Sequence, residues 1–121
     1  FFFKDLSMDF IVELPEVQGY DTILVIVDRM TKRARFIPTT TTPTAKDTTR
    51  LVHDHWICLF GVPSSIVSDR YPQFTSSFWT QSMRHLGVRL RRGTGVQLAR
   101  VPYNWSQSIF SFLRLRPAHA D

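Results

Sequence analysis

Two aspartates stand where the sequence could carry metal chemistry. Asp9 lies inside "LSMDFIVELP", an apolar run that predicts a buried strand, and burial of an unpaired carboxylate is costly. Asp69 ends a second apolar run, "SSIVSD". If the two strands are neighbours in one sheet, both carboxylates can share a divalent cation, which stabilises a carboxylate in an apolar setting. Hard oxygen ligands favour Mg²⁺ or Mn²⁺ over Zn²⁺.

The elements that would position these aspartates alternate between strands and helices. Three strands joined by short turns predict an antiparallel meander, and a helix between the first and fourth strands predicts that those two run parallel. The predicted strands cover residues 6–14, 22–28, 34–39, 64–69 and 88–93, and the predicted helices cover 44–60 and 75–87. Thr44 with Asp47 resembles a capping box, and Gly61 is a candidate helix C-cap.

Length and composition favour one intracellular domain. The chain has 121 residues, of which 43% are hydrophobic, and this predicts a packed core. No apolar run approaches the roughly 20 residues that span a bilayer, so we expect no membrane partner. The single cysteine, Cys58, excludes an internal disulfide and favours a reducing compartment, nuclear or cytoplasmic. Its place in a predicted helix suggests a small buried hydrophobe.

The net charge of +5 is unevenly distributed. Residues 1–83 carry eight lysines and arginines against nine aspartates and glutamates. Residues 84–121 carry seven arginines and one aspartate, so the whole positive excess lies in the last third. Lys32, Arg33, Arg35 and Arg70 are candidate phosphate contacts in the first part, and a solvated rim explains them equally well.

Several separated motifs occur together in a recognisable order. They are "MDF", "VDRMTK", "FIP" and "GVPSSIVSDR…FTSSFW", within residues 4–90. In these blocks the sequence resembles the integrase catalytic core of Ty3/gypsy-type LTR retrotransposons, a retroviral-integrase-like family. The resemblance implies an α/β, RNase H-like fold: a mixed five-stranded sheet flanked by helices, with the C-terminal helical part incomplete or altered here.

The resemblance also implies an activity. Members of this family are metal-dependent polynucleotidyl transferases that trim the 3′ ends of element DNA and join them to target DNA. An Asp, Asp and Glu set holds Mg²⁺ ions that activate the attacking group and stabilise the phosphoryl transition state. Asp9 and Asp69 match the first two acidic residues by motif. The implied partners are DNA, as element ends and target, and a second copy of the chain.

The third acidic residue of the family has no counterpart in the matching position. By spacing it falls near Trp105, in "VPYNWSQSI", where Asn104 and Gln107 are neutral. Asp121 is the only acidic residue after Asp69, and it lies far beyond this spacing. A missing ligand weakens metal binding and removes charge stabilisation from the transition state. We therefore expect an inactive integrase-core fragment, or a catalytically dead module that binds nucleic acid or dimerises.

The resemblance ends near Arg92. We therefore expect an integrase-core-like domain over residues 1–92 and a divergent tail over 93–121. Our hypothesis is that a frameshift produced the tail, in which case its arginines say little about DNA binding.

Structural roles compete with functional ones at other positions. Without the resemblance, Asp9 would be an ordinary hydrogen-bonded strand residue and Asp69 the start of a turn. Asp28 also ends a strand, and the turn chemistry of "DRMTK" favours a structural role. His53 and His55 lie two apart on a helix and face different ways, which suits no metal site. The aromatic residues Phe74, Phe78 and Trp79 are expected in the core.

Overall fold

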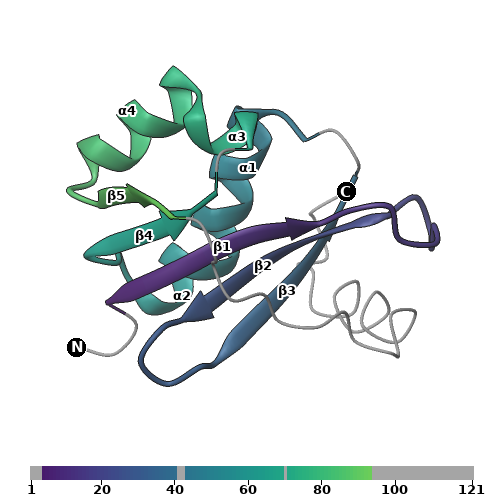
Figure 1. The fold of residues 1–121 in the computed structure, drawn as a ribbon, viewed down its shortest axis with the longest axis horizontal. Coiled ribbons are helices and arrows are strands. Elements are labelled where there is room, and N and C mark those ends of the chain that lie inside the picture. Colours follow the sequence, from purple (N-terminus) through teal and green to yellow (C-terminus); the bar gives the residue numbers. More distant parts are fainter. Residues whose placement is uncertain (1–3, 41–42, 70, 94–121) are drawn as a thin grey trace.

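Five strands form one mixed sheet in the computed structural model, which describes residues 4–40, 43–69 and 71–93. The strand order is β3-β2-β1-β4-β5 (Figure 1). The strands are β1 (Asp5–Ile11), β2 (Thr22–Asp28), β3 (Ala34–Thr39), β4 (Ser65–Ser68) and β5 (Arg89–Arg92). The helical segments are α1 (Ala45–Val52), η1 (His53–Ile57), α2 (Cys58–Phe60), α3 (Pro72–Thr75) and α4 (Ser77–His85).

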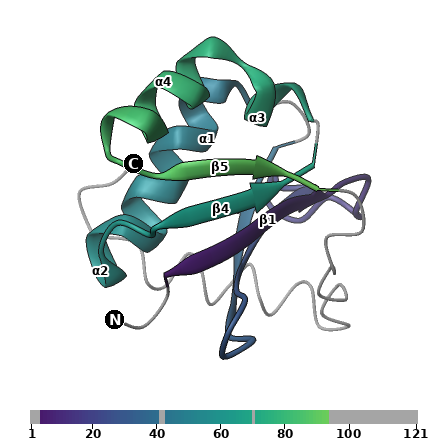
Figure 2. The same cartoon turned by 60° about the vertical axis from the view of Figure 1, so that its left-hand side comes forward.

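The pairing of the strands confirms the predicted meander and crossover. β1 pairs antiparallel with β2, and β2 pairs antiparallel with β3. β4 lies parallel to β1 and β5 lies parallel to β4, so all three run in the same direction (Figure 2). This arrangement brings the carboxyl ends of β1 and β4 to the same edge of the sheet, where α/β proteins commonly place their chemistry.

One helical run, α1–η1–α2, connects the meander to β4. It begins at a complete capping box: the Thr44 hydroxyl accepts from the Asp47 N–H, and the Asp47 carboxylate accepts from the Thr44 N–H. It ends at Gly61, whose φ of 91° is a conformation that favours glycine. The predicted extent is correct, but the middle turn, η1, is wider than an α-helical turn because the Cys58 N–H donates to the His53 carbonyl.

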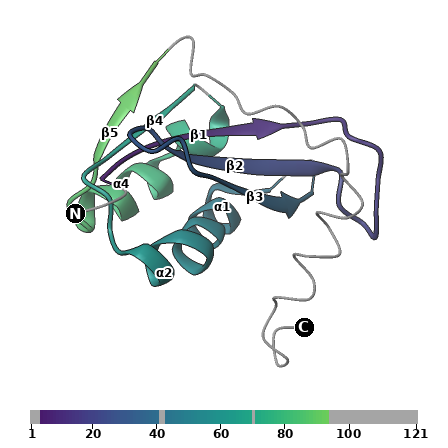
Figure 3. The ribbon, with the colours of Figure 1, turned by 90° about the horizontal axis from the view of Figure 1, so that it is seen from below.

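The helices cover one face of the sheet, and the main core lies between the helices and this face (Figure 3). Alternation along each strand assigns residues to this face or to the opposite one. The helix-covered core contains Leu6, Met8, Phe10, Leu24, Ile26, Ile37, Val52, Trp56, Ile66, Phe74, Trp79, Met83 and Val88. A second apolar cluster, built on Ile23 and Val25, lies on the opposite face. Asp9 pairs with Val25, so it belongs to this second face.

Several local predictions need correction. Phe74 and Trp79 are buried as expected, but Phe78 is 47% exposed on the outer side of α4. Cys58 is exposed and does not fill the core. The predicted second helix is divided, because Ser76 adopts an extended conformation and caps α4 by accepting from the Trp79 N–H. None of the helices in the described ranges has the length and apolar character needed to cross a membrane.

The predictions for the C-terminal helical part, the divergent tail and Arg70 fall outside the described residues.

Candidate functional site

The register of β1 and β4 brings Asp9 and Asp69 together. Met8 pairs with Ser68 at the last ladder position, so Asp9 and Asp69 are the next residues along the two parallel strands. Both side chains therefore belong to the face that the helices leave uncovered. The two carboxyl groups are close enough for Asp69 to raise the pKa of Asp9. The sequence-predicted pair is thus a real spatial pair, at the carboxyl ends of adjacent strands.

The electrostatics of this pair centre on Asp9. Its side chain is buried, at 7% exposed. Burial is the main cause that raises the pKa of Asp9 from 3.8 to about 7, and the hydrogen bond and repulsion from the Asp69 carboxyl act in the same direction. The Phe10 N–H, which donates to Asp9 Oδ1 at 2.7 Å, lowers the pKa and only partly offsets these effects. Asp9 therefore holds its proton up to near neutral pH.

Tyr71 completes the surroundings of the pair, and sequence reasoning missed it. Its backbone N–H donates to Asp69 Oδ1 at 3.0 Å, which fixes that carboxylate at the start of α3. Its ring packs edge-on against Phe10, with centroids 5.9 Å apart. Burial, followed by the negative charges of Asp9 and Asp69, raises the pKa of the Tyr71 hydroxyl. The signal in the sequence was its position two residues after Asp69, within a segment interpreted only as a turn.

The donor set fits a hard divalent cation. Two carboxyl groups lie close together, one of them in a buried position, and a bound cation can relieve their repulsion in place of the Asp9 proton. Carboxylate oxygens are the ligands that Mg²⁺ and Mn²⁺ prefer. No third acidic side chain joins Asp9 and Asp69 among the residues that the structure describes.

Lys32, Arg33 and Arg35, the predicted basic residues within the described ranges, lie away from this pair. Lys32 and Arg33 lie in the β2–β3 turn, beside the start of β1, where the Arg29 N–H donates to the Asp5 carbonyl. Arg35 lies on the helix-covered face, with its guanidinium 5.9 Å from the centroid of the Phe60 ring. Their role in nucleic-acid contact stays a prediction.

Other arginines lie closer in the sheet to the acidic pair. β5 is an edge strand, and its Arg89 and Arg91 are exposed. Arg91 pairs with Val67, which pairs with Ser7, so Arg91 shares the sheet face of Asp9. Sequence reasoning counted these residues with the C-terminal charge excess and assigned them no role. Their alternation along "VRLRR" was the available signal.

Asp28 has the structural role that its turn context predicted. Its Oδ2 accepts hydrogen bonds from the N–H and the hydroxyl of Thr31. These bonds close the turn between β2 and β3. Asp28 also pairs with Leu6, on the opposite face from Asp9, and so is separate from the acidic pair.

Comparisons with known proteins agree with this geometry. The family model described as "Integrase core domain" matches residues 4–94. The chain is 43% identical over 76 residues to the Tf2-3 and Tf2-4 transposon polyproteins of Schizosaccharomyces pombe, an overlap of 63% of this chain and 6% of each polyprotein. The chain therefore spans only a small part of the length of these relatives.

Solved structures share the fold at low sequence identity. The HTLV-2 integrase catalytic core domain in complex with magnesium, in its trimeric form, aligns with a TM-score of 0.64 and 17% identity, over 75% of this chain and 60% of that chain. The simian T-cell lymphotropic virus intasome in complex with the PP2A regulatory subunit B56 gamma aligns with a TM-score of 0.68 and 16% identity, over 93% and 42%. The fold is RNase H-like, as the sequence predicted. The family match extends over most of the described chain, and the chain belongs to the integrase core domain family.

Proposed function

We propose that this chain is the catalytic-core fragment of a retrotransposon integrase, in which Asp9 and Asp69 bind Mg²⁺ or Mn²⁺, and that it is inactive in joining DNA. The observation that carries the proposal is the pair of neighbouring carboxyl groups at the ends of two adjacent parallel strands. The magnesium complex of a retroviral integrase core with the same fold supports the choice of ion. When bound, such an ion would stabilise charge on a phosphoryl group.

The residues of this chain prepare the pair for a cation. The Phe10 N–H orients the Asp9 carboxylate, and the Tyr71 N–H orients that of Asp69. The Phe10 and Tyr71 rings pack together beside the pair. Because Asp9 keeps its proton until about pH 7, cation binding must release that proton, and the affinity should rise with pH.

The proposed partner is the phosphate backbone of DNA. The intasome neighbour supports this class of partner, and the exposed arginines of β5 supply positive charge on the sheet face of Asp9. Backbone contacts of this kind are independent of sequence and weaken steeply with salt. Lys32 and Arg33 form a second candidate contact at the other end of β1.

A non-catalytic module is the second candidate function. One observation favours dimerisation: Phe78 and Leu86 are 47% and 42% exposed, and they line an open hollow on α4 with Gln81, Ser82 and His85. Related integrase cores have been solved as dimers and trimers. A second copy of the chain could bury this apolar surface.

We also keep the division of the chain into a core over residues 1–92 and a tail over 93–121 as a proposal. Sequencing the encoding DNA across codons 88–121 tests the frameshift hypothesis. A glutamate in the family pattern in another frame would support it, and its absence from all frames would refute it.

The inactivity is tested with the purified chain and a DNA duplex that carries a 3′-hydroxyl end. In Mg²⁺ or Mn²⁺ we expect strand joining no greater than that of the Asp9→Asn/Asp69→Asn double variant, because two carboxylates provide too few ligands for the metal set of the family. The same duplex should still bind, with an affinity that falls as salt rises and falls further in an Arg89→Gln/Arg91→Gln variant. Metal-dependent joining that Asp69→Asn abolishes would show that the chain is active.

A further inference from the structure

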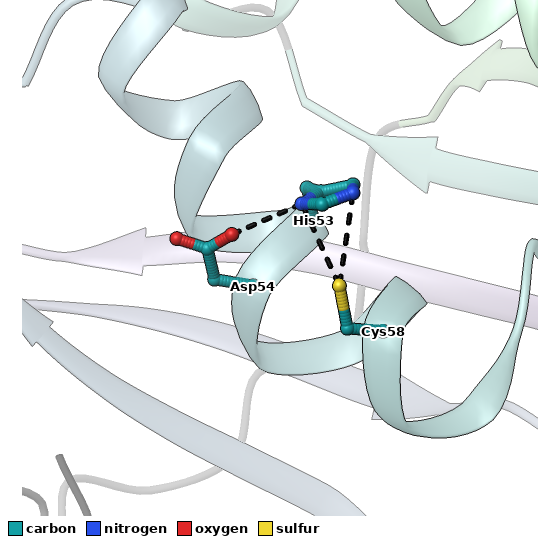
Figure 4. Close-up of side chains that lie close together, drawn as sticks. All are labelled: His53, Asp54 and Cys58. Carbon is teal, nitrogen blue, oxygen red and sulfur yellow. Dashed lines mark hydrogen bonds and ion pairs between the residues drawn. The ribbon is translucent and has the colours of Figure 1, made fainter. Parts of the chain in front are cut away.

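We propose a second metal site, specific for Zn²⁺-like ions, formed by His53, Asp54 and Cys58 on the outer side of the α1–η1–α2 run. Figure 4 shows the three side chains gathered on one side of this run, with the thiol next to the imidazole ring. One ligand atom from each residue lies within 4.8 Å of the others. This site is separate from the acidic pair, which belongs to the other face of the sheet.

The wide turn η1 creates this cluster. In an α-helix with 3.6 residues per turn, residues five apart point to different sides. Here the Cys58 N–H bonds to the His53 carbonyl, so the turn is wider and position 58 lies nearer to the side of position 53 than in an α-helix. The prediction that His53 and His55 suit no metal site assumed α-helical spacing. The wide turn changes this spacing and brings Cys58 close to His53. Turns of this kind occur frequently at functional sites.

The distances suit a small tetrahedral ion. Cys58 Sγ lies 3.7 Å from His53 Nδ1, and His53 Nδ1 lies 3.0 Å from Asp54 Oδ1. The ligand atoms of a tetrahedral zinc site are about 3.4 Å apart, given its bond lengths. Cys58 Sγ also lies 3.7 Å from His53 Nε2, so the thiol lies over the face of the ring, and the ring must turn to direct a lone pair to an ion that Cys58 shares. The His53 and Asp54 side chains are 56% and 53% exposed, which leaves room for this turn, and water can supply the fourth ligand.

The donor types distinguish this site from the acidic pair. A thiolate and an imidazole are soft or borderline ligands, which select Zn²⁺ over Mg²⁺. The paired carboxylates of Asp9 and Asp69 have the opposite preference. Binding at the proposed site deprotonates the Cys58 thiol, and the proton passes to solvent.

Titration of the full chain with Co²⁺, under a non-coordinating reductant, tests the proposal. We expect a near-ultraviolet thiolate-to-cobalt absorption band that saturates at one ion per chain and disappears when Zn²⁺ is added. Cys58→Ser and His53→Gln should each abolish the band, and Asp54→Asn should weaken it. All three residues are exposed, so the variants should keep the circular dichroism spectrum of the parent.

Two control variants test whether the ion binds at His53, Asp54 and Cys58 and not elsewhere on the chain. His85→Gln removes another exposed helical histidine, and Asp69→Asn removes a carboxylate of the acidic pair; both should keep the full band. The proposal is overturned if no band forms at excess Co²⁺, if the band survives Cys58→Ser, or if it is lost in Asp69→Asn. A band that saturates at half an ion per chain would also overturn it, because two chains would then share the ion.

Discussion

Replacing Trp79 by alanine is expected to lower the free energy of unfolding by about 3 to 5 kcal/mol, the usual range for removing a buried tryptophan. Trp79 is 0% exposed and belongs to the helix-covered core. Its ring packs edge-on against Phe74, with centroids 5.3 Å apart, so the change removes apolar burial and an aromatic contact together. Small domains have only about 5 to 15 kcal/mol of stability, so much of the chain should unfold.

The adjacent residue provides the control for this change. Phe78 lies on the same helix and is 47% exposed, so Phe78→Ala should cost far less than Trp79→Ala. Urea denaturation followed by circular dichroism measures both variants. Equal losses of stability would show that α4 does not pack through Trp79 as described.

The second large expected effect is a loss of stability with rising pH, caused by the carboxyl group of Asp9. The folded-state pKa of Asp9, about 7, lies above the ordinary value of 3.8. Between these values the folded chain keeps a proton that the unfolded chain has released. The contribution of Asp9 to stability is therefore present below about pH 4 and is lost as the pH rises through 7. The full loss is about 4 kcal/mol in the absence of divalent cations.

Asp9→Asn should remove this penalty. Asparagine keeps the size of the side chain and an acceptor for the Phe10 N–H, but it carries no charge at any pH. Relative to the parent, the variant should gain stability between pH 4 and 7 and level off above pH 7, measured by urea denaturation with a chelator present. Glu16→Gln, at an exposed carboxylate, should show no such gain. A constant difference between Asp9→Asn and the parent across this range would contradict the buried, paired state of Asp9.

The fold could be predicted largely from local patterns. The β-branched run of β2, the capping box at Thr44 and the glycine at position 61 each determine structure through nearby residues. The approach of Asp9 to Asp69 followed from topology, because one helical crossover makes β1 and β4 parallel neighbours. The assignment of a metal role, however, rested on the family motifs and not on the pattern.

The predictions that were wrong or incomplete, at Cys58, Phe78 and Tyr71, depend on local geometry or tertiary contacts that the sequence pattern does not specify. The exposure of Cys58 and its approach to His53 depend on one extra residue in a helical turn, which no residue type in "HDHWIC" specifies. Phe78 follows the apolar spacing of the segment, but the extended Ser76 begins a new helix and turns Phe78 outward. Tyr71 reaches the acidic pair through a tertiary contact with Phe10.

The most direct test of the central claim is the thermal stability of the chain at pH 8 with increasing Mn²⁺. If Asp9 and Asp69 form one cation site, the parent should be stabilised by Mn²⁺, because the ion binds the folded chain and relieves the repulsion of the pair. Asp9→Asn and Asp69→Asn should each lose this response, and Cys58→Ser should keep it. Equal stabilisation of the parent and both aspartate variants, or no response of the parent to Mn²⁺, would contradict the claim.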